Sequence, residues 1–283
     1  MHGSALVARR GMRGYTGRMD LAYRDLGGEG PPIVFLHGLF GSSQNWVGMG
    51  RRLSGLGRCL LLDLRNHGDS RHAPEHSLET CVEDVLEWAH LHAPGPLRLI
   101  GHSMGGLVAM GFAILQPDST GAVVSIDMAP RGYPRAHEAE FRAFHTDISA
   151  CRSRAELDGL LAPLLVDPAT RQFIMTNAVR DGYGFRWRLN VPALESSTIS
   201  SDFSHISGRF DGPALLVSGG RSSYVTQADL PVMRRHFPAA VIETIPQADH
   251  WVHISAPEEL AVILTGFFNG SMAGAIKGRG FRP

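Results

Sequence analysis

The chain has few cysteines, no excess of charge of either sign and no long hydrophobic run. Its 283 residues include only three cysteines, Cys59, Cys81 and Cys151. So small, odd and scattered a set argues against a disulfide framework and favours a reducing compartment. Lys+Arg and Asp+Glu both number 27, so no net field attracts nucleic acid or an anionic membrane surface. No run approaches the roughly 18 apolar residues that a membrane span requires.

The two ends of the chain differ in composition from its middle. Residues 1–18 carry four arginines and no acidic residue, but they lack the apolar segment of a secretory signal. We interpret residues 1–17 and 270–283 as flexible termini, with an organelle transit peptide as the alternative at the N-terminus. Together with the cysteine content, this favours a cytoplasmic location.

Short apolar runs alternate with segments of helical periodicity over most of the chain. The runs lie at residues 32–36, 59–64, 97–100, 122–126, 214–218 and 241–245, and the helical segments at 78–89, 107–115, 227–236 and 257–268. The runs are continuous rather than alternating, which indicates strands buried on both faces of a parallel sheet. The order predicts an α/β fold with a doubly wound, mostly parallel sheet.

One long segment, residues 130–207, interrupts this alternation. It contains no clear strand but has helical patches at 138–148 and 154–165. An insertion of this length is uncommon unless it has a function, and it follows a strand at the edge of the sheet where ligands bind. We therefore expect a core of residues 18–129 and 208–269, and a helical cap of residues 130–207 over a pocket.

Residues 101–106 read Gly-His-Ser-Met-Gly-Gly, between an apolar strand and a helical segment. Strand, Gly-x-Ser-x-Gly and helix is the context of a nucleophile elbow, in which a sharp turn exposes the serine hydroxyl. The glycines allow the close contact between helix and strand that larger side chains would block. An ordinary Gly/Ser turn is the alternative. The pattern predicts Ser103 as a nucleophile.

A serine nucleophile needs a base, a group that orients the base, and donors for the oxyanion. His250 follows the last expected strand and precedes the last helix, which matches the order serine, acid, histidine of this architecture. His253 is a rival, but it lies where the following helix should begin. We predict His250 as the base.

The acid is the least obvious member of the set. In most proteins of this architecture it follows the strand before the last, where this chain has Ser222–Ser223. Asp127 ends the strand after the elbow in an apolar setting, where a carboxylate needs a partner, and we assign it to His250. The alternatives are that Asp127 only caps the following loop, that Asp249 serves, although neighbours on one loop seldom reach each other's ring, or that Asp229 serves, although it should lie inside a helix.

Two backbone N–H groups should bind the oxyanion. One is expected from Met104, directly after the serine, and the other from Leu39, with Phe40 as the neighbouring alternative. Bulky apolar side chains are candidates for an acyl pocket, although such side chains are as often simply core: Phe40, Trp46, Met128 and Trp187. Trp187, Arg188 and Asn190 either face this pocket or pin the cap.

Other polar residues near these motifs have simpler interpretations. Asp63, Arg65 and Asp69 are expected to brace the loop beside the site. Residues 72–76 spell the H-x-x-E-H metal motif, which must lie on a helix to align its ligands. Because Pro74 would break such a helix, we expect no zinc site and no metal.

The motifs together resemble the α/β-hydrolase fold family. They are His37-Gly38, residues 63–70 (Asp-Leu-Arg-Asn-His-Gly-Asp-Ser), the elbow and His250. Residues 125–130, 187–190 and 219–225 look like the branch of small bacterial acyl esterases and their mitochondrial relatives. The resemblance covers residues 18–269 and implies a displaced acid after the earlier strand. Asp249 departs from the pattern, in which glycine is common.

These residues predict a serine hydrolase that cleaves a small-molecule carboxylic ester or thioester through an acyl-enzyme, with no cofactor. A serine nucleophile argues against dehalogenase and epoxide hydrolase chemistry, which use aspartate on this fold. A cofactor-free perhydrolase or carbon–carbon lyase with the same triad is the alternative, and a non-catalytic binding protein is a second. We expect no nucleic-acid partner, no stable membrane insertion, and a monomer or homodimer.

Overall fold

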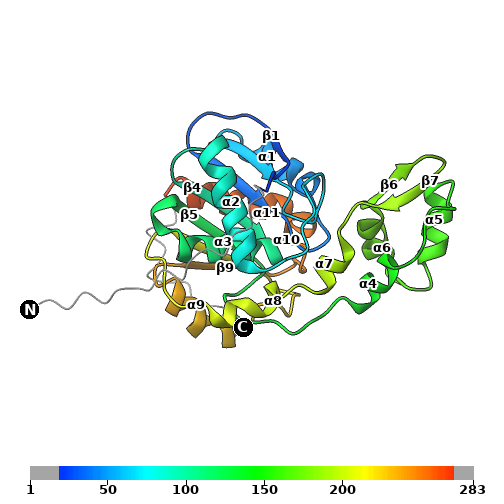
Figure 1. The fold of residues 1–283 in the computed structure, drawn as a ribbon. Coiled ribbons are helices and arrows are strands. Elements are labelled where there is room, and N and C mark those ends of the chain that lie inside the picture. The colour runs from blue at the N-terminus through cyan, green and yellow to red at the C-terminus, as the bar shows by residue number, and fades with distance from the viewer. Residues whose placement is uncertain (1–18, 271–283) are drawn as a thin grey trace, which may run out of the picture.

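The computed structural model describes residues 19–270, so the interpretations of residues 1–17 and 271–283 lie outside it. Seven strands form one sheet in the order β1-β3-β2-β4-β5-β8-β9 (Figure 1). Their bounds are β1 (Tyr23–Asp25), β2 (Pro32–Leu36), β3 (Arg58–Leu62), β4 (Leu97–His102), β5 (Thr120–Ile126), β8 (Ala214–Gly219) and β9 (Val241–Ile245). Only β1 pairs antiparallel with its neighbour, which confirms the doubly wound, mostly parallel sheet.

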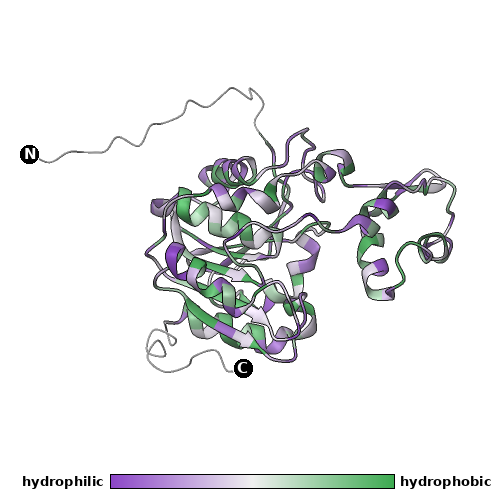
Figure 2. Ribbon diagram, turned by 90° about the horizontal axis from the view of Figure 1, so that it is seen from below, coloured by the Kyte–Doolittle hydropathy of each residue, from purple (hydrophilic) through white to green (hydrophobic). Residues whose placement is uncertain are grey.

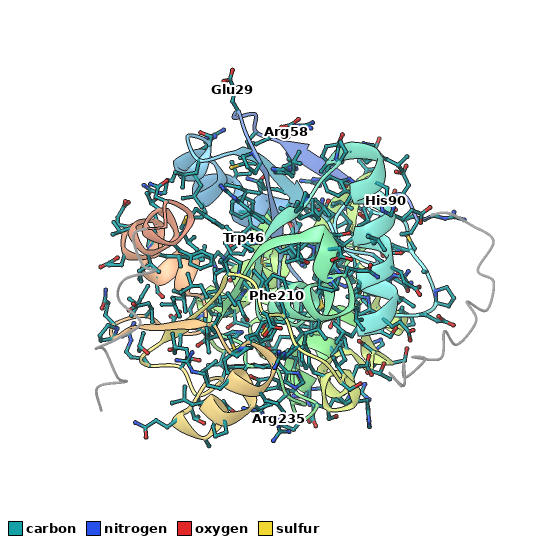
Figure 3. All side chains as sticks on the ribbon, turned by 90° about the vertical axis from the view of Figure 1, so that its left-hand side faces the viewer. Glu29, Trp46, Arg58, His90, Phe210 and Arg235 are labelled. Carbon is teal, nitrogen blue, oxygen red and sulfur yellow. The ribbon has the colours of Figure 1, made fainter. Side chains whose placement is uncertain are left out.

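Helices cover both faces of this sheet. One face carries α2 (Leu78–His92), α3 (Met104–Leu115) and α9 (Leu230–His236), and the other carries α1 (Val47–Leu53), α10 (Val252–Ser255) and α11 (Pro257–Phe268). Short 3₁₀ turns occur at η1 (Ser43–Trp46), η2 (Pro117–Ser119), η3 (Phe203–His205) and η4 (Gln227–Asp229). Figure 3 shows Trp46 and Phe210 within the body and Glu29 and Arg235 at its periphery.

The burial of the central strands on both faces explains why their apolar runs are continuous in the sequence. Along β2, Ile33 and Phe35 belong to the hydrophobic cluster under α1 and α11, whereas Val34 and Leu36 belong to the cluster under α2 and α3. Successive side chains of a strand point to opposite faces. Since helices cover both faces, every position must be apolar, and no alternation of polar residues appears in the sequence.

The insertion after β5 contains more than helices. It holds α4 (Glu138–Phe144), α5 (Arg154–Leu161), α6 (Pro168–Met175), α7 (Val191–Glu195) and α8 (Ile199–Asp202), together with the hairpin β6 (Ala178–Asp181) and β7 (Gly184–Trp187). The expectation of no strand in this segment is therefore wrong. The two-residue loop of the hairpin begins with Gly182 at φ 56°, and glycine is favoured at the first position of such a loop because φ is positive there. The sequence does not reveal these two strands because each has only four residues, too few for a periodic pattern to be recognised.

The insertion has its own hydrophobic cluster. Figures 1 and 2 show it to one side of the core, joined to it by two chain segments. Its cluster includes Phe144, Leu157, Ile174 and Phe185, and it takes in one residue of the core, Phe40. In contrast, α8 packs its one apolar residue, Ile199, against the core. Within residues 19–270, no helix combines the length and the apolarity needed to cross a bilayer.

Candidate active site

Ser103 lies at the sharp turn between β4 and α3. Its backbone has φ 53° and ψ −121°, a region that L-residues adopt only where the surrounding structure enforces it. A Cβ atom on Gly101 would lie 2.0 Å from the carbonyl oxygen of Gly105, and one on Gly105 would lie 2.3 Å from that of Leu36. Both glycines are therefore required for strand and helix to approach this closely.

His250 follows β9 and contacts both other members of the predicted set. Its Nε2 lies 3.1 Å from Ser103 Oγ, and its Nδ1 lies 2.7 Å from Asp127 Oδ2. The ring of Tyr224 stacks on the imidazole, with centroids 3.8 Å apart and planes 17° apart. His102 Nε2 donates to the carbonyl oxygen of His250 at 2.8 Å. The backbone and one ring face of His250 are thus held in place.

Asp127 is fully buried at the end of β5. Its Oδ1 accepts the N–H of Gly219 at 3.0 Å, and its Oδ2 accepts the hydroxyl of Ser222 as well as His250 Nδ1–H. Three donors therefore satisfy the oxygens of this buried side chain, as a buried carboxyl group requires. Ser222 follows β8, the strand after which most proteins of this architecture carry the acid. In the sequence this serine stood out, but no role was assigned to it. A serine in place of the usual acid is the signal that identifies Ser222.

The rival residues make other contacts. Asp249 Oδ1 accepts the N–H of Trp251 at 2.9 Å. Asp229 ends the short turn η4 and pairs with Arg131 at 2.6 Å. His253 is buried in α10, and this burial lowers the pKa of its imidazole to about 4. None of the three joins the hydrogen-bonded chain from the nucleophile to the buried carboxylate.

The loop after β2 presents the expected oxyanion donor. Gly41 N–H and His37 Nδ1 both donate to the carbonyl oxygen of Gly38, at 3.0 and 2.8 Å. Because the peptide unit is planar and trans, fixing this carbonyl points the N–H of Leu39 the opposite way. The Leu39 N–H is therefore oriented by hydrogen bonds that it does not itself make.

The same loop decides between the two neighbouring candidates. The N–H of Phe40 donates to His67 Nε2 at 3.2 Å, so it is already engaged. The N–H groups of Leu39 and Met104 find no acceptor among the described residues. Met104 is the first residue of α3, where the helix dipole favours negative charge. Leu39 and Met104 thus remain as the available pair.

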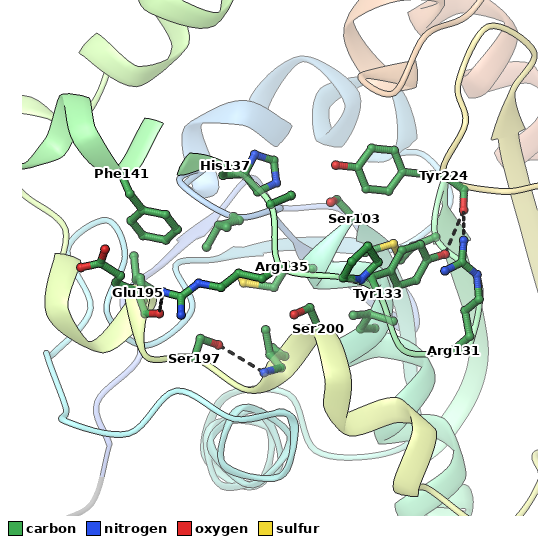
Figure 4. A pocket seen from close by; sticks show the side chains of 18 of the residues that line it. Ser103, Arg131, Tyr133, Arg135, His137, Phe141, Glu195, Ser197, Ser200 and Tyr224 are labelled. Carbon is green, nitrogen blue, oxygen red and sulfur yellow. Dashed lines mark hydrogen bonds between the residues drawn. The ribbon is translucent and has the colours of Figure 1, made fainter. Parts of the chain in front are cut away.

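Ser103 lines two cavities. The larger has a volume of about 360 Å³ and extends from Ser103 and Tyr224 toward Phe141 and Glu195 (Figure 4). Much of its wall is apolar: Leu39, Met104, Leu107, Met128, Phe141, Leu194 and Ile199. Its polar wall includes Arg131, Arg135, Ser200 and Ser223. The smaller cavity, of about 60 Å³, lies beside His102 and His250.

The predicted pocket residues fall in different places. Met128 lines the larger cavity, and Phe40 and Trp46 line the smaller one. Trp187 lines neither of these two cavities. Its ring packs edge-on against Phe144, with centroids 4.9 Å apart, so it packs against the hydrophobic cluster of the insertion instead.

The polar residues beside the site brace it, as expected. Asp63 accepts the N–H groups of Ser43 and Asp69 at 2.6 and 2.8 Å. Arg65 forms a buried two-pronged ion pair with Asp84, the bidentate geometry that carboxylates favour with arginine.

Asn190 joins the insertion after β5 to the core through hydrogen bonds. Its Nδ2 donates to Asn66 Oδ1 at 3.0 Å and to the carbonyl oxygen of Ala73 at 2.9 Å.

The two histidines of the H-x-x-E-H sequence at residues 72–76 contact different partners. His72 Nε2 lies 3.0 Å from the carbonyl oxygen of Arg188, and His76 Nε2 lies 3.4 Å from Met104 Sδ.

Comparisons with known proteins agree on one family. A model of the alpha/beta hydrolase family matches residues 33–263. The sn-1-specific diacylglycerol lipase ABHD11 of Mus musculus is 36% identical over 262 residues, 88% of this chain and 85% of that protein. Esterase YbfF of Escherichia coli K12 is 31% identical over 245 residues, 84% of this chain and 93% of that protein. A solved marine microorganism esterase has a TM-score of 0.83 at 32% identity and covers 88% of this chain and 99% of its own. The chain belongs to the alpha/beta hydrolase family.

Proposed function

We propose that the protein hydrolyses carboxylic esters or thioesters through an acyl-enzyme on Ser103, with His250 as base and Asp127 as the orienting acid. The observation that carries this proposal is the imidazole of His250, hydrogen-bonded at once to the serine hydroxyl and to a fully buried carboxylate. The names of the relatives, an esterase and a diacylglycerol lipase, support the reaction class.

In the first half of the reaction, Ser103 Oγ attacks the substrate carbonyl carbon while His250 Nε2 takes the hydroxyl proton. Asp127 stabilises the imidazolium through Nδ1–H. The carbonyl oxygen becomes an oxyanion, which the N–H groups of Leu39 and Met104 receive. When the intermediate collapses, the carbon–oxygen or carbon–sulfur bond breaks and His250 returns the proton to the leaving alcohol or thiol.

In the second half, water replaces the leaving group. His250 takes a proton from water as its oxygen attacks the acyl carbon, and the same two N–H groups receive the second oxyanion. Collapse of this intermediate breaks the bond to Ser103 Oγ, which regains its proton from His250. The carboxylic acid product leaves, and the enzyme is restored.

The larger cavity is proposed to hold the acyl chain. Its volume of about 360 Å³ lies within the usual range of small-ligand sites. Three of its apolar residues, Phe141, Leu194 and Ile199, come from the insertion after β5, which supports the interpretation of residues 130–207 as a cap. A chain-length series of nitrophenyl and acyl-CoA esters would show which acyl groups fit.

Ser103→Ala tests the proposal. With a nitrophenyl butyrate substrate, turnover should fall on the order of 10⁶-fold if the triad acts as a unit, and a fluorophosphonate probe should no longer label the protein. Ser200→Ala is the matched control, since Ser200 lines the same cavity and should leave labelling intact. Hydrolysis that survives in Ser103→Ala would overturn the serine mechanism.

A further inference from the structure

Phe40, in the oxyanion loop, packs into the hydrophobic cluster of the cap. Its side chain leaves the core and is 2% exposed within the cap cluster. The phenyl ring lies 5.1 Å from that of Phe141 and 5.0 Å from that of Phe144, centroid to centroid. The backbone of Phe40 has φ 63°, a left-handed conformation that usually belongs to glycine. Contacts around Phe40 must therefore maintain this conformation.

Two buried side chains hold the backbone of Phe40 from opposite sides. His67, from the core, accepts its N–H at 3.2 Å. Asn177, from the cap between α6 and β6, donates Nδ2–H to its carbonyl oxygen at 2.8 Å. Asn177 is 1% exposed, so water does not compete for this hydrogen bond.

Asn177 is itself rigidly placed. Its N–H donates to the carbonyl oxygen of Ile174 at 3.0 Å, and its carbonyl oxygen accepts the N–H of Arg188 at 2.9 Å. These bonds fix its backbone between the end of α6 and the residue that follows β7. A donor on so constrained a backbone can determine where the carbonyl of Phe40 lies.

We propose that Asn177 is a positioning residue for ester hydrolysis: by holding the carbonyl of Phe40, the cap sets the orientation of the adjacent Leu39 N–H. The carbonyl of Phe40 shares its peptide unit with the N–H of Gly41, which donates to the carbonyl oxygen of Gly38. The Gly38 carbonyl shares its own peptide unit with the Leu39 N–H, so a rotation at Phe40 is transmitted to that N–H. The inference rests on the proposed function, in which Leu39 N–H receives the oxyanion. It makes the contact between Asn177 and Phe40 a condition for fast chemistry, while the cap also forms a wall of the cavity.

Three substitutions test this role. Asn177→Ala removes the side-chain amide, Asn177→Asp keeps its shape but removes the N–H donor, and Asn177→Ser restores a donor on a shorter arm. Steady-state hydrolysis of nitrophenyl butyrate gives kcat and KM, with active sites counted by fluorophosphonate titration so that unfolded protein does not contribute. Affinity for a trifluoromethyl ketone, which forms an oxyanion on the serine, is the second readout.

The expected result is a loss in kcat with little change in KM. Removal of a whole oxyanion donor costs roughly 10²- to 10³-fold, so a misplaced one should cost about 10- to 100-fold in Asn177→Ala and Asn177→Asp. The ketone should bind more weakly by a similar factor, and Asn177→Ser should recover part of both. Asn190→Ala is the matched control, because Asn190 pins the cap to a different loop; it should lower thermal stability and leave kcat per active site unchanged.

Equal loss of kcat in Asn190→Ala and Asn177→Ala would show a general effect of cap docking and overturn the specific role. Unchanged kcat per active site in the Asn177 variants, or a rise in KM alone, would overturn it as well. These outcomes leave fluorophosphonate labelling of Ser103 intact in the unaltered protein. Failure of the proposed function is separate, since it appears as absent labelling or as activity that survives Ser103→Ala.

Discussion

Replacing Asp127 by asparagine is a sharp perturbation because each hydrogen-bond partner of its carboxylate is a donor. Oδ1 faces the N–H of Gly219, and Oδ2 faces His250 Nδ1 and the hydroxyl of Ser222. Asparagine has a single carbonyl oxygen, so in Asp127→Asn one of these sides must face an NH₂ group. The two orientations of the amide have different costs, and those costs decide the outcome.

If the NH₂ group faces Gly219, two N–H groups oppose each other in a buried site, which costs roughly 1–3 kcal/mol. If it faces His250, the imidazole can accept it at Nδ1, and the hydroxyl of Ser222 can rotate to accept it too. The second orientation leaves no buried donor unpaired and should prevail. It places the ring proton on Nε2, toward Ser103, where a lone pair is needed to accept the serine proton.

We therefore expect Asp127→Asn to fold normally and to lose kcat by about 10⁴-fold, the effect of the corresponding change in a serine protease, or about 5.5 kcal/mol. Hydrolysis of nitrophenyl butyrate measures the loss, and thermal unfolding checks the fold. Asp249→Asn is the control: Asp249 only accepts the N–H of Trp251, which an amide oxygen also does. The assignment of the acid is refuted if Asp249→Asn proves more damaging than Asp127→Asn.

Ser222→Ala removes one hydrogen-bond donor to the carboxylate of Asp127. Because such a bond contributes roughly 1.5–3 kcal/mol, kcat should fall about 10- to 100-fold. Ser223→Ala should have little effect, and equal losses of kcat in the two variants would contradict the role of Ser222 as a donor to Asp127. Acid should also destabilise the fold. Burial lowers the pKa of His76 to about 3 and that of His253 to about 4. In the unfolded chain these two imidazoles take up protons as the pH falls below about 6.5, whereas in the folded chain they stay neutral to a lower pH. The free energy of unfolding is therefore at its full value above this pH and declines below it, by up to about 1.4 kcal/mol per pH unit for each histidine. Urea midpoints measured through this range should give a shallower slope for His76→Gln, and an identical slope would count against this cause.

Much of the core could be predicted because its constraints are local in sequence. A strand buried on both faces must be a continuous apolar run, so β2 (Pro32–Leu36) was predicted at its observed bounds. The strand β1 (Tyr23–Asp25) was missed because it has three residues, lies at the sheet edge and is partly exposed. No periodicity is detectable over so short a segment.

The candidate site divides in the same way. Ser103, Asp127 and His250 each follow a strand whose end can be located from the sequence, and they lie within hydrogen-bond distance. The contact between Asn177 and Phe40 joins residues 137 positions apart. It depends on how the cap docks, and no pattern of spacing specifies that docking. Side chains that act across such an interface become visible only when the chain is folded.

The segment that follows β5 connects the insertion to the residues that surround His250. Only a few residues after Asp127, Arg131 pairs with Asp229, and the hydroxyl of Tyr133 donates to the carbonyl oxygen of Tyr224, whose ring stacks on the base. A chimaera that received a foreign lid from residue 130 onward would lose these ties along with the old specificity. The splice site for exchanging the insertion belongs after Tyr133, because an earlier cut would change the surroundings of His250 together with the lining of the larger cavity.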